Sequence, residues 1–160
     1  MIAALAVSGV IIVLVLAIHM VGLGALLVMI RWRGDGAREP GHRLVQAGLI
    51  LAVVLGVLGL HGIEIWLFAG LYLLLGEIGT LEEALYFSAS TFSTLGYGDV
   101  VLSASWRLVA AMEGITGFLL IGWSTAFLVS ISSKIRMFEA SLEREGPAPQ
   151  SLSTATESEN

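Results

Sequence analysis

The chain has 160 residues, of which 56% are hydrophobic and only 13% are charged, and its mean hydropathy is +0.89. This composition is far more apolar than that of a soluble domain, so it predicts one membrane domain with a tail. The sequence contains no cysteine, which excludes disulfides and thiolate metal sites. The formal net charge of −5 is less informative than the positions of the charges.

Three segments are apolar over at least the ~20 residues that a helix needs to cross the hydrocarbon core. These segments are residues 1–30, 44–76 and 108–133. His61 and Glu64 interrupt the second segment, and Glu113 interrupts the third. Residues 80–107 are too polar and too short for a further crossing. We therefore expect a re-entrant loop there, buried in protein or lining water.

Residues 1–30 predict a transmembrane helix in addition to the two that follow. A secretory signal peptide is the alternative interpretation. Such peptides carry basic residues before an apolar run of about 7–15 residues. Here no Lys or Arg precedes the run, and the run is longer, so we expect a membrane helix.

The basic residues are distributed unevenly along the chain. Seven of the eight Lys and Arg residues lie in the loop 31–43 or after residue 133, and only Arg107 lies on the other side. The positive-inside rule makes that loop and the tail 134–160 cytoplasmic, and it places the N-terminus outside. The end of the tail is rich in Pro, Ser, Thr and Glu, which is typical of disordered chain.

Between the second and third apolar segments lies the string Thr94-Leu95-Gly96-Tyr97-Gly98-Asp99. A dehydrated K⁺ ion needs a cage of oxygen atoms, which backbone carbonyls can supply. Gly96 and Gly98 fall at alternate positions, where the chain must adopt backbone angles that are inexpensive only for glycine. Thr94 can add a hydroxyl oxygen, and Tyr97 can point away from the ion path and brace the loop.

This string and its surroundings resemble the pore domain of the potassium channel superfamily, in particular the small bacterial members with one pore loop per chain. The resemblance covers residues 44–133, and residues 86–94 are similar to the family's pore helix with its paired aromatic residues. The filter differs at Leu95, where valine is more usual, but the carbonyl is unchanged and we expect selectivity to persist. Ser90 stands where some relatives carry a buried glutamate, so their inactivation behaviour is not carried over.

The resemblance implies an all-α membrane protein with three transmembrane helices, a re-entrant pore helix and a selectivity-filter loop. It further implies a homotetramer, which we expect in the bacterial inner (plasma) membrane. Within residues 44–133 the implied parts are an outer helix 44–76, a pore helix 81–93, a filter 94–98 and an inner helix 106–133. Residues Thr94, Leu95, Gly96, Tyr97 and Gly98 would bind K⁺. Membrane lipid is the other expected partner, and neither nucleic acid nor an organic cofactor is expected.

The pore helix has a recognisable beginning. Thr80 and Glu83 fit a capping box, with Thr80 as the N-cap, and the acidic first turn complements the positive helix start. The helix would end near Ser93 with its negative end toward the ion path. Acidic residues on the outer side would concentrate cations at a symmetric mouth, although solvated surface charge is an equally compatible interpretation. The resemblance assigns Asp99 a hydrogen bond behind the filter.

Two glycines in the third segment, Gly114 and Gly117, are candidates for a gating hinge. Glycine inside a helix costs roughly 1 kcal/mol relative to alanine, so each glycine needs a reason. Close packing of helices on small residues is the alternative, and the sequence does not decide between the two.

The ionisable residues at membrane depth are the remaining candidates, because such groups are costly and face protein or water. We expect Glu113 to bond to the pore helix through Ser90 or Thr91 and so to support the filter from behind. His61 and Glu64 share a helix face and form a candidate proton-sensitive pair. A structural hydrogen bond is the alternative for both sites, and it is the preferred interpretation of His19.

Together these features predict a passive, potassium-selective tetrameric channel. The alternatives are a weakly selective cation channel and a non-conducting regulatory membrane subunit. An enzyme is not expected, because the few ionisable groups form no recognisable nucleophile or metal-ligand pattern, and the glycine pair lacks the strand–helix setting of a phosphate loop.

Overall fold

The computed structural model describes residues 1–34 and 43–144, so the predictions for residues 35–42 and for the end of the tail lie outside the described residues. The chain divides into two units, residues 1–128 and residues 129–160. The second unit contains the C-terminal part of the last helix. The site described below lies within the first unit.

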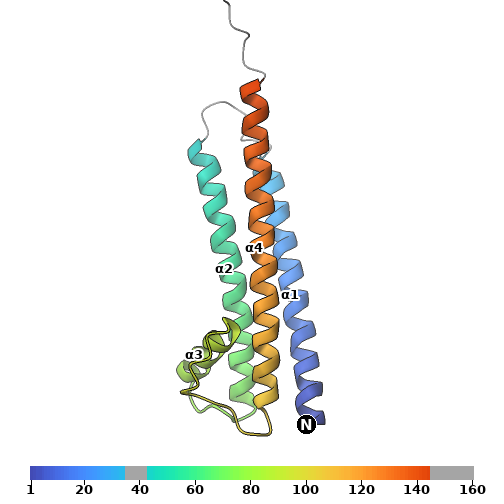
Figure 1. The fold of residues 1–160 in the computed structure, drawn as a ribbon, viewed down its shortest axis with the longest axis vertical. Helices are drawn as coiled ribbons and strands as arrows, with labels where there is room; N and C mark the ends of the chain where they lie inside the picture. Colours follow the sequence, from blue (N-terminus) through green and yellow to red (C-terminus); the bar gives the residue numbers. More distant parts are fainter. Residues whose placement is uncertain (35–42, 145–160) are drawn as a thin grey trace, which may run out of the picture. The chain divides into compact units, whose positions relative to one another are not determined.

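The described residues form four helices and no strand (Figure 1). The helices are α1 (Ile2–Gly34), α2 (Arg43–Leu74), α3 (Leu81–Phe92) and α4 (Arg107–Arg144). Three of them contain apolar stretches of 27 to 31 residues. A helical stretch of that length is about 40 Å or longer, enough to cross a hydrocarbon core of about 30 Å. The all-α fold with three long apolar helices and one short helix confirms the predicted class.

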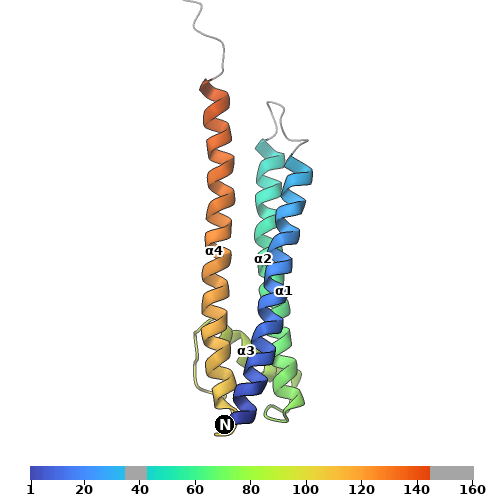
Figure 2. The same ribbon diagram turned by 90° about the vertical axis from the view of Figure 1, so that its right-hand side faces the viewer.

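Helices α1 and α2 pack against each other, as Figure 2 shows. Small residues allow this close approach. A Cβ atom added at Gly22 would lie 2.6 Å from the side chain of Leu60, and one added at Gly56 would lie 2.5 Å from that of Leu26. A leucine side chain of the facing helix therefore packs against each glycine, which is a common arrangement between membrane helices.

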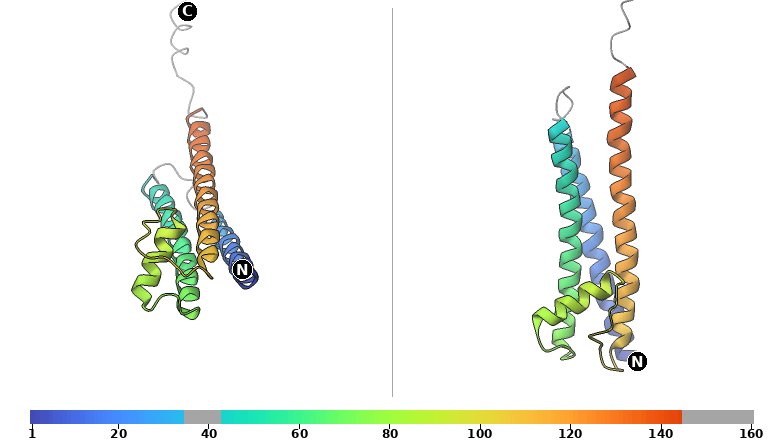
Figure 3. Two further views of the ribbon diagram at one scale, coloured as in Figure 1. Left: turned by 60° about the horizontal axis from the view of Figure 1, so that its bottom comes forward. Right: turned by 60° about the vertical axis from the view of Figure 1, so that its left-hand side comes forward.

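The short helix α3 lies beside α2, near the C-terminal end of α2 (Figure 3). It begins as predicted, because the Thr80 hydroxyl accepts a hydrogen bond from the Glu83 amide at 3.3 Å. The buried rings of Tyr72 on α2 and Phe87 on α3 meet edge to face at a centroid distance of 5.1 Å. Aromatic burial and an end cap thus fix a helix of only 12 residues.

The segment after α3 is tied to the turn that follows α2. The Glu77 carboxylate accepts hydrogen bonds from the amide of Ser103 at 2.7 Å and from its hydroxyl at 2.9 Å. The carbonyl of Ser103 in turn accepts from the Arg107 amide at the start of α4. Glu77 therefore has a structural partner in the segment that leads into α4.

Candidate pore loop and its supports

The loop after α3 has an unusual backbone. Thr94, Gly96 and Gly98 have positive φ angles of 61°, 55° and 78°, whereas Leu95 and Tyr97 do not. When the sign of φ alternates along the chain, successive peptide groups point in the same direction. The amide groups then lie on one side of the loop and the carbonyl groups on the other. Glycine adopts these angles at little cost. The positive φ of Thr94 costs about 1–3 kcal/mol, and such a conformation persists only where the surrounding structure imposes it.

The amides of this loop are turned back toward the end of α3. The carbonyl of Ser90 accepts hydrogen bonds from the amides of Leu95 at 2.9 Å and Gly96 at 3.0 Å, and the Thr91 carbonyl accepts from the Thr94 amide at 2.9 Å. The Ser90 hydroxyl stays within α3 and donates to the Phe87 carbonyl. Ser90 therefore contacts the loop through its backbone and not through its side chain.

The side chains of the loop are exposed to solvent in a single chain. Leu95 is 56% exposed and Tyr97 is 67% exposed, whereas Phe92 at the end of α3 is buried. Irregular backbone at membrane depth is tolerated only where protein buries it or water lines it. One copy of the chain does not provide that cover for residues 93–99.

Asp99 is joined to α3 by a side-chain contact. The Tyr86 hydroxyl donates to the Asp99 carboxylate at 2.8 Å, and both groups are exposed in the single chain. This hydrogen bond lowers the pKa of Asp99 below its ordinary value and raises that of Tyr86. The bond connects the end of the loop to the helix that precedes it.

Glu113 on α4 is fully buried and accepts two hydrogen bonds of 2.5 Å, one from the Tyr72 hydroxyl on α2 and one from the Ser88 hydroxyl on α3. The expected contact with the pore helix is present, but its partner is Ser88 instead of Ser90 or Thr91. Ser90 is two positions from Ser88 and faces another direction, whereas Thr91 is three positions away and lies on the same face, about one turn further along α3. The sequence could give neither the rotation of α3 nor the point along α3 that faces Glu113. Glu113 holds three helices together at one point.

Gly114 and Gly117 lie where α4 passes the end of α3. A Cβ atom at Gly117 would overlap the Phe92 carbonyl, and one at Gly114 would lie 3.4 Å from the Thr91 carbonyl. Close approach to the helix that carries the loop therefore accounts for Gly117. The helix α4 runs without interruption through both positions, and the hinge role remains a prediction.

His61 and Glu64 form the expected pair, but the structure adds a third residue that the sequence interpretation set aside. The Glu64 carboxylate lies 2.8 Å from Nδ1 of His61 and 2.8 Å from Nδ1 of His19 on α1. His19 and Glu64 are fully buried. They are 45 positions apart, so local spacing gives no signal. The one sequence feature that the two residues share is a position in the middle of an apolar span.

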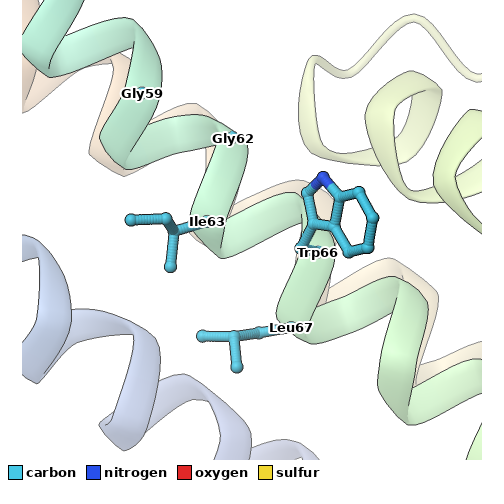
Figure 4. Close-up of a pocket in the computed structure, with 5 residues that line it drawn as sticks. All are labelled: Gly59, Gly62, Ile63, Trp66 and Leu67. Carbon is cyan, nitrogen blue, oxygen red and sulfur yellow. The ribbon is translucent and has the colours of Figure 1, made fainter.

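An apolar groove of about 400 Å³ lies on the opposite face of α2 (Figure 4). Its lining residues are Gly59, Gly62, Ile63, Trp66 and Leu67. Positions three and four apart share a helix face, which separates this lining from His61 and Glu64. Because no charged side chain lines it, the groove is suited to lipid chains or to another apolar helix surface.

Comparison with protein families gives one match within this chain. A family model described as "Ion channel" matches residues 60–134. That range contains the second half of α2, all of α3, the loop and the apolar part of α4, and it leaves α1 outside. No curated protein and no solved structure matches the chain significantly.

Proposed function

Because residues 60–134 are an ion channel family domain, consistent with the predicted potassium channel pore, we propose that this membrane protein conducts K⁺ selectively through a filter at residues 94–98. The observation that carries the proposal is the alternating sign of φ at residues 94–98, together with the return of the loop amides to the Ser90 carbonyl. With the amides engaged behind the loop, the carbonyls are free to face an ion. A row of carbonyls of this kind replaces the hydration shell of K⁺.

The proposed assembly is a homotetramer. One loop presents carbonyls from one direction only, whereas an ion in a filter is surrounded. Leu95 and Tyr97 are large, apolar or aromatic, and exposed in one chain, so neighbouring copies would cover them. A closed ring of identical chains repeats the loop around one axis without adding any other component.

Charge placement supports the conduction of cations. The C-terminal end of α3, where carbonyls carry the negative end of the helix dipole, lies next to the loop. Glu82, Glu83 and Asp99 lie on the side that the positive-inside rule places outside. Four copies of these carboxylates would raise the local cation concentration. We place the channel in the bacterial inner membrane with its N-terminus outside.

Current through the purified protein in a planar bilayer tests this function, with K⁺ on one side and Na⁺ on the other. We expect a reversal potential close to the K⁺ equilibrium value. Reversal near zero would instead identify a weakly selective cation channel, in which the loop is not held in the proposed shape. Correctly assembled tetramers that pass no current under any ionic condition would favour a regulatory subunit.

A further inference from the structure

The cluster formed by His19, His61 and Glu64 lies outside the pore loop and needs its own explanation. One donor atom from each residue, the two imidazole nitrogens and a carboxylate oxygen, lies within 4.8 Å of the others. Both histidines present the same atom, Nδ1, to Glu64 at 2.8 Å. His19 comes from α1 and the other two from α2, so the cluster joins helices across a tertiary contact.

The burial of Glu64 needs compensation. Its carboxylate is fully buried at membrane depth, where an uncompensated charge is costly. Among the residues whose side chains the structure describes, the ion-pair partners of Glu64 are His19 and His61. The carboxyl group is therefore either protonated itself, or compensated by a proton on an imidazole or by a cation held between the three side chains.

The second imidazole favours a metal cation. Neutral imidazoles that each donate Nδ1–H to one carboxylate oxygen are the alternative, and the second imidazole matters here because it adds a second nitrogen ligand at the same distance. A metal ion uses both nitrogens and the carboxylate together. Ligands about 2.1 Å from a tetrahedral zinc ion lie about 3.4 Å apart, so metal binding needs the 2.8 Å nitrogen–oxygen contacts to lengthen and the wider spacing, within 4.8 Å, to shorten.

The surroundings resemble those of a metal site in two respects. The second nitrogen of His19, Nε2, lies 3.5 Å from the Ser124 hydroxyl on α4, and bonds of this kind orient metal-binding imidazoles. The ring of His61 lies 5.6 Å from that of Phe92, and the ring of His19 lies 6.0 Å from that of Trp123. These two aromatic rings flank the imidazoles, and Phe92 is buried.

We propose that His19, His61 and Glu64 bind one divalent transition metal ion of the zinc class per chain, clamping α1 to α2. Two imidazoles and one carboxylate suit zinc, which binds nitrogen and oxygen ligands with a fourth position open. The clamp gives a role to α1, the helix that the family match does not include. The proposal does not depend on the function of the loop, so either can fail alone.

Metal binding is tested on the full chain in detergent after treatment with a chelator. Equilibrium dialysis against Zn²⁺ should load one ion per chain, and Co²⁺ should give the absorption of a tetrahedral nitrogen–oxygen site. Glu64→Gln and His19→Asn should each weaken binding by at least about tenfold, since even outer-shell changes cost that much. The matched control is Ser8→Ala on α1, which removes a hydroxyl that bonds to the Ala4 carbonyl within its own helix and should bind like the unaltered chain.

Two results would overturn the proposal. If the unaltered chain binds no Zn²⁺ or Co²⁺ at micromolar concentration, the cluster is a hydrogen-bonded link between helices and nothing more. If Glu64→Gln binds as tightly as the unaltered chain, the metal lies elsewhere. Should Glu64→Gln or His19→Asn fail to fold, Ser124→Ala, which keeps all three ligands, should still weaken binding, and unchanged affinity there would count against the proposed geometry.

Discussion

The pore loop at residues 93–99 and the helices behind it are held by different parts of the chain. In the loop, backbone angles and amide hydrogen bonds define the shape, while Leu95 and Tyr97 remain exposed in one chain. Behind the loop, the buried Glu113 carboxylate and the close contact at Gly117 join α2, α3 and α4. Backbone changes should therefore dominate in the loop, and side-chain or packing changes should dominate behind it.

The largest effect is expected for Gly96→Ala. Gly96 has a φ of +55°, where a residue with a Cβ atom costs about 1–2 kcal/mol, and the proposed homotetramer would repeat this strain four times. We expect loss of K⁺ selectivity or of current, measured as reversal potential in a bilayer. Leu95→Val is the matched control, because it changes a neighbouring side chain and leaves the carbonyl in place. Full selectivity in Gly96→Ala would contradict the claim that the backbone defines the loop.

Gly117→Ala tests the packing behind the loop. The added methyl group meets the Phe92 carbonyl, a backbone atom that cannot rotate away, so α4 must move from the end of α3. Overpacking of this kind costs about 1–3 kcal/mol. We expect the assembled protein to be less stable to heat. The measurement is gel filtration of samples heated to a series of temperatures. Gly122→Ala on the same helix meets nothing within 4 Å and should be neutral or slightly stabilising.

Glu113→Gln tests the side-chain support. The amide keeps one oxygen for Tyr72 or Ser88 but replaces the other acceptor with a donor, so one buried hydrogen bond is lost or reversed. Loss of such a bond costs about 1–3 kcal/mol. We expect a drop in thermal stability similar to that for Gly117→Ala and a measurable loss of selectivity. Stability and selectivity equal to those of the unaltered chain would show that Glu113 is not a support of the loop.

Much of the fold could be predicted because its signals are local. Long apolar runs predict α1, α2 and α4, and Thr80 with Glu83 predicts where α3 begins. The same local reasoning placed Glu113 against α3 but chose Ser90 or Thr91 as its partner. A helix turns by about 100° per residue, so Ser90, two positions from Ser88, points to another side, whereas Thr91, three positions away, lies nearly one turn along the same face.

The His19 contact could not be predicted because it depends on how two helices align. Spacing along α2 brings His61 and Glu64 to one face, but no spacing relates either residue to α1. Only the register of α1 against α2 brings His19 to the same carboxylate. The candidate metal site is therefore a product of tertiary packing, and the sequence alone offered two histidines and a glutamate without a common location.

The smallest effect is expected for Tyr86→Phe, a side-chain change at the edge of the loop. The Tyr86 hydroxyl lowers the pKa of Asp99, so Asp99 stays ionised at a pH where an ordinary aspartate begins to protonate. A lowered pKa stabilises the folded protein above the unfolded value of about 3.9, and this contribution is lost as pH falls through the folded pKa. Removing the hydroxyl returns the pKa of Asp99 toward its ordinary value.

We therefore expect Tyr86→Phe to conduct normally at pH 7 and to lose current at a higher pH than the unaltered chain as the solution is acidified toward pH 4. Tyr97→Phe is the control, since no hydrogen bond is found for its hydroxyl among the described residues. Identical acid profiles for Tyr86→Phe and the unaltered chain would show that this bond does not govern Asp99. A loss of selectivity at pH 7 as large as that of Gly96→Ala would show that side chains define the loop as much as its backbone does.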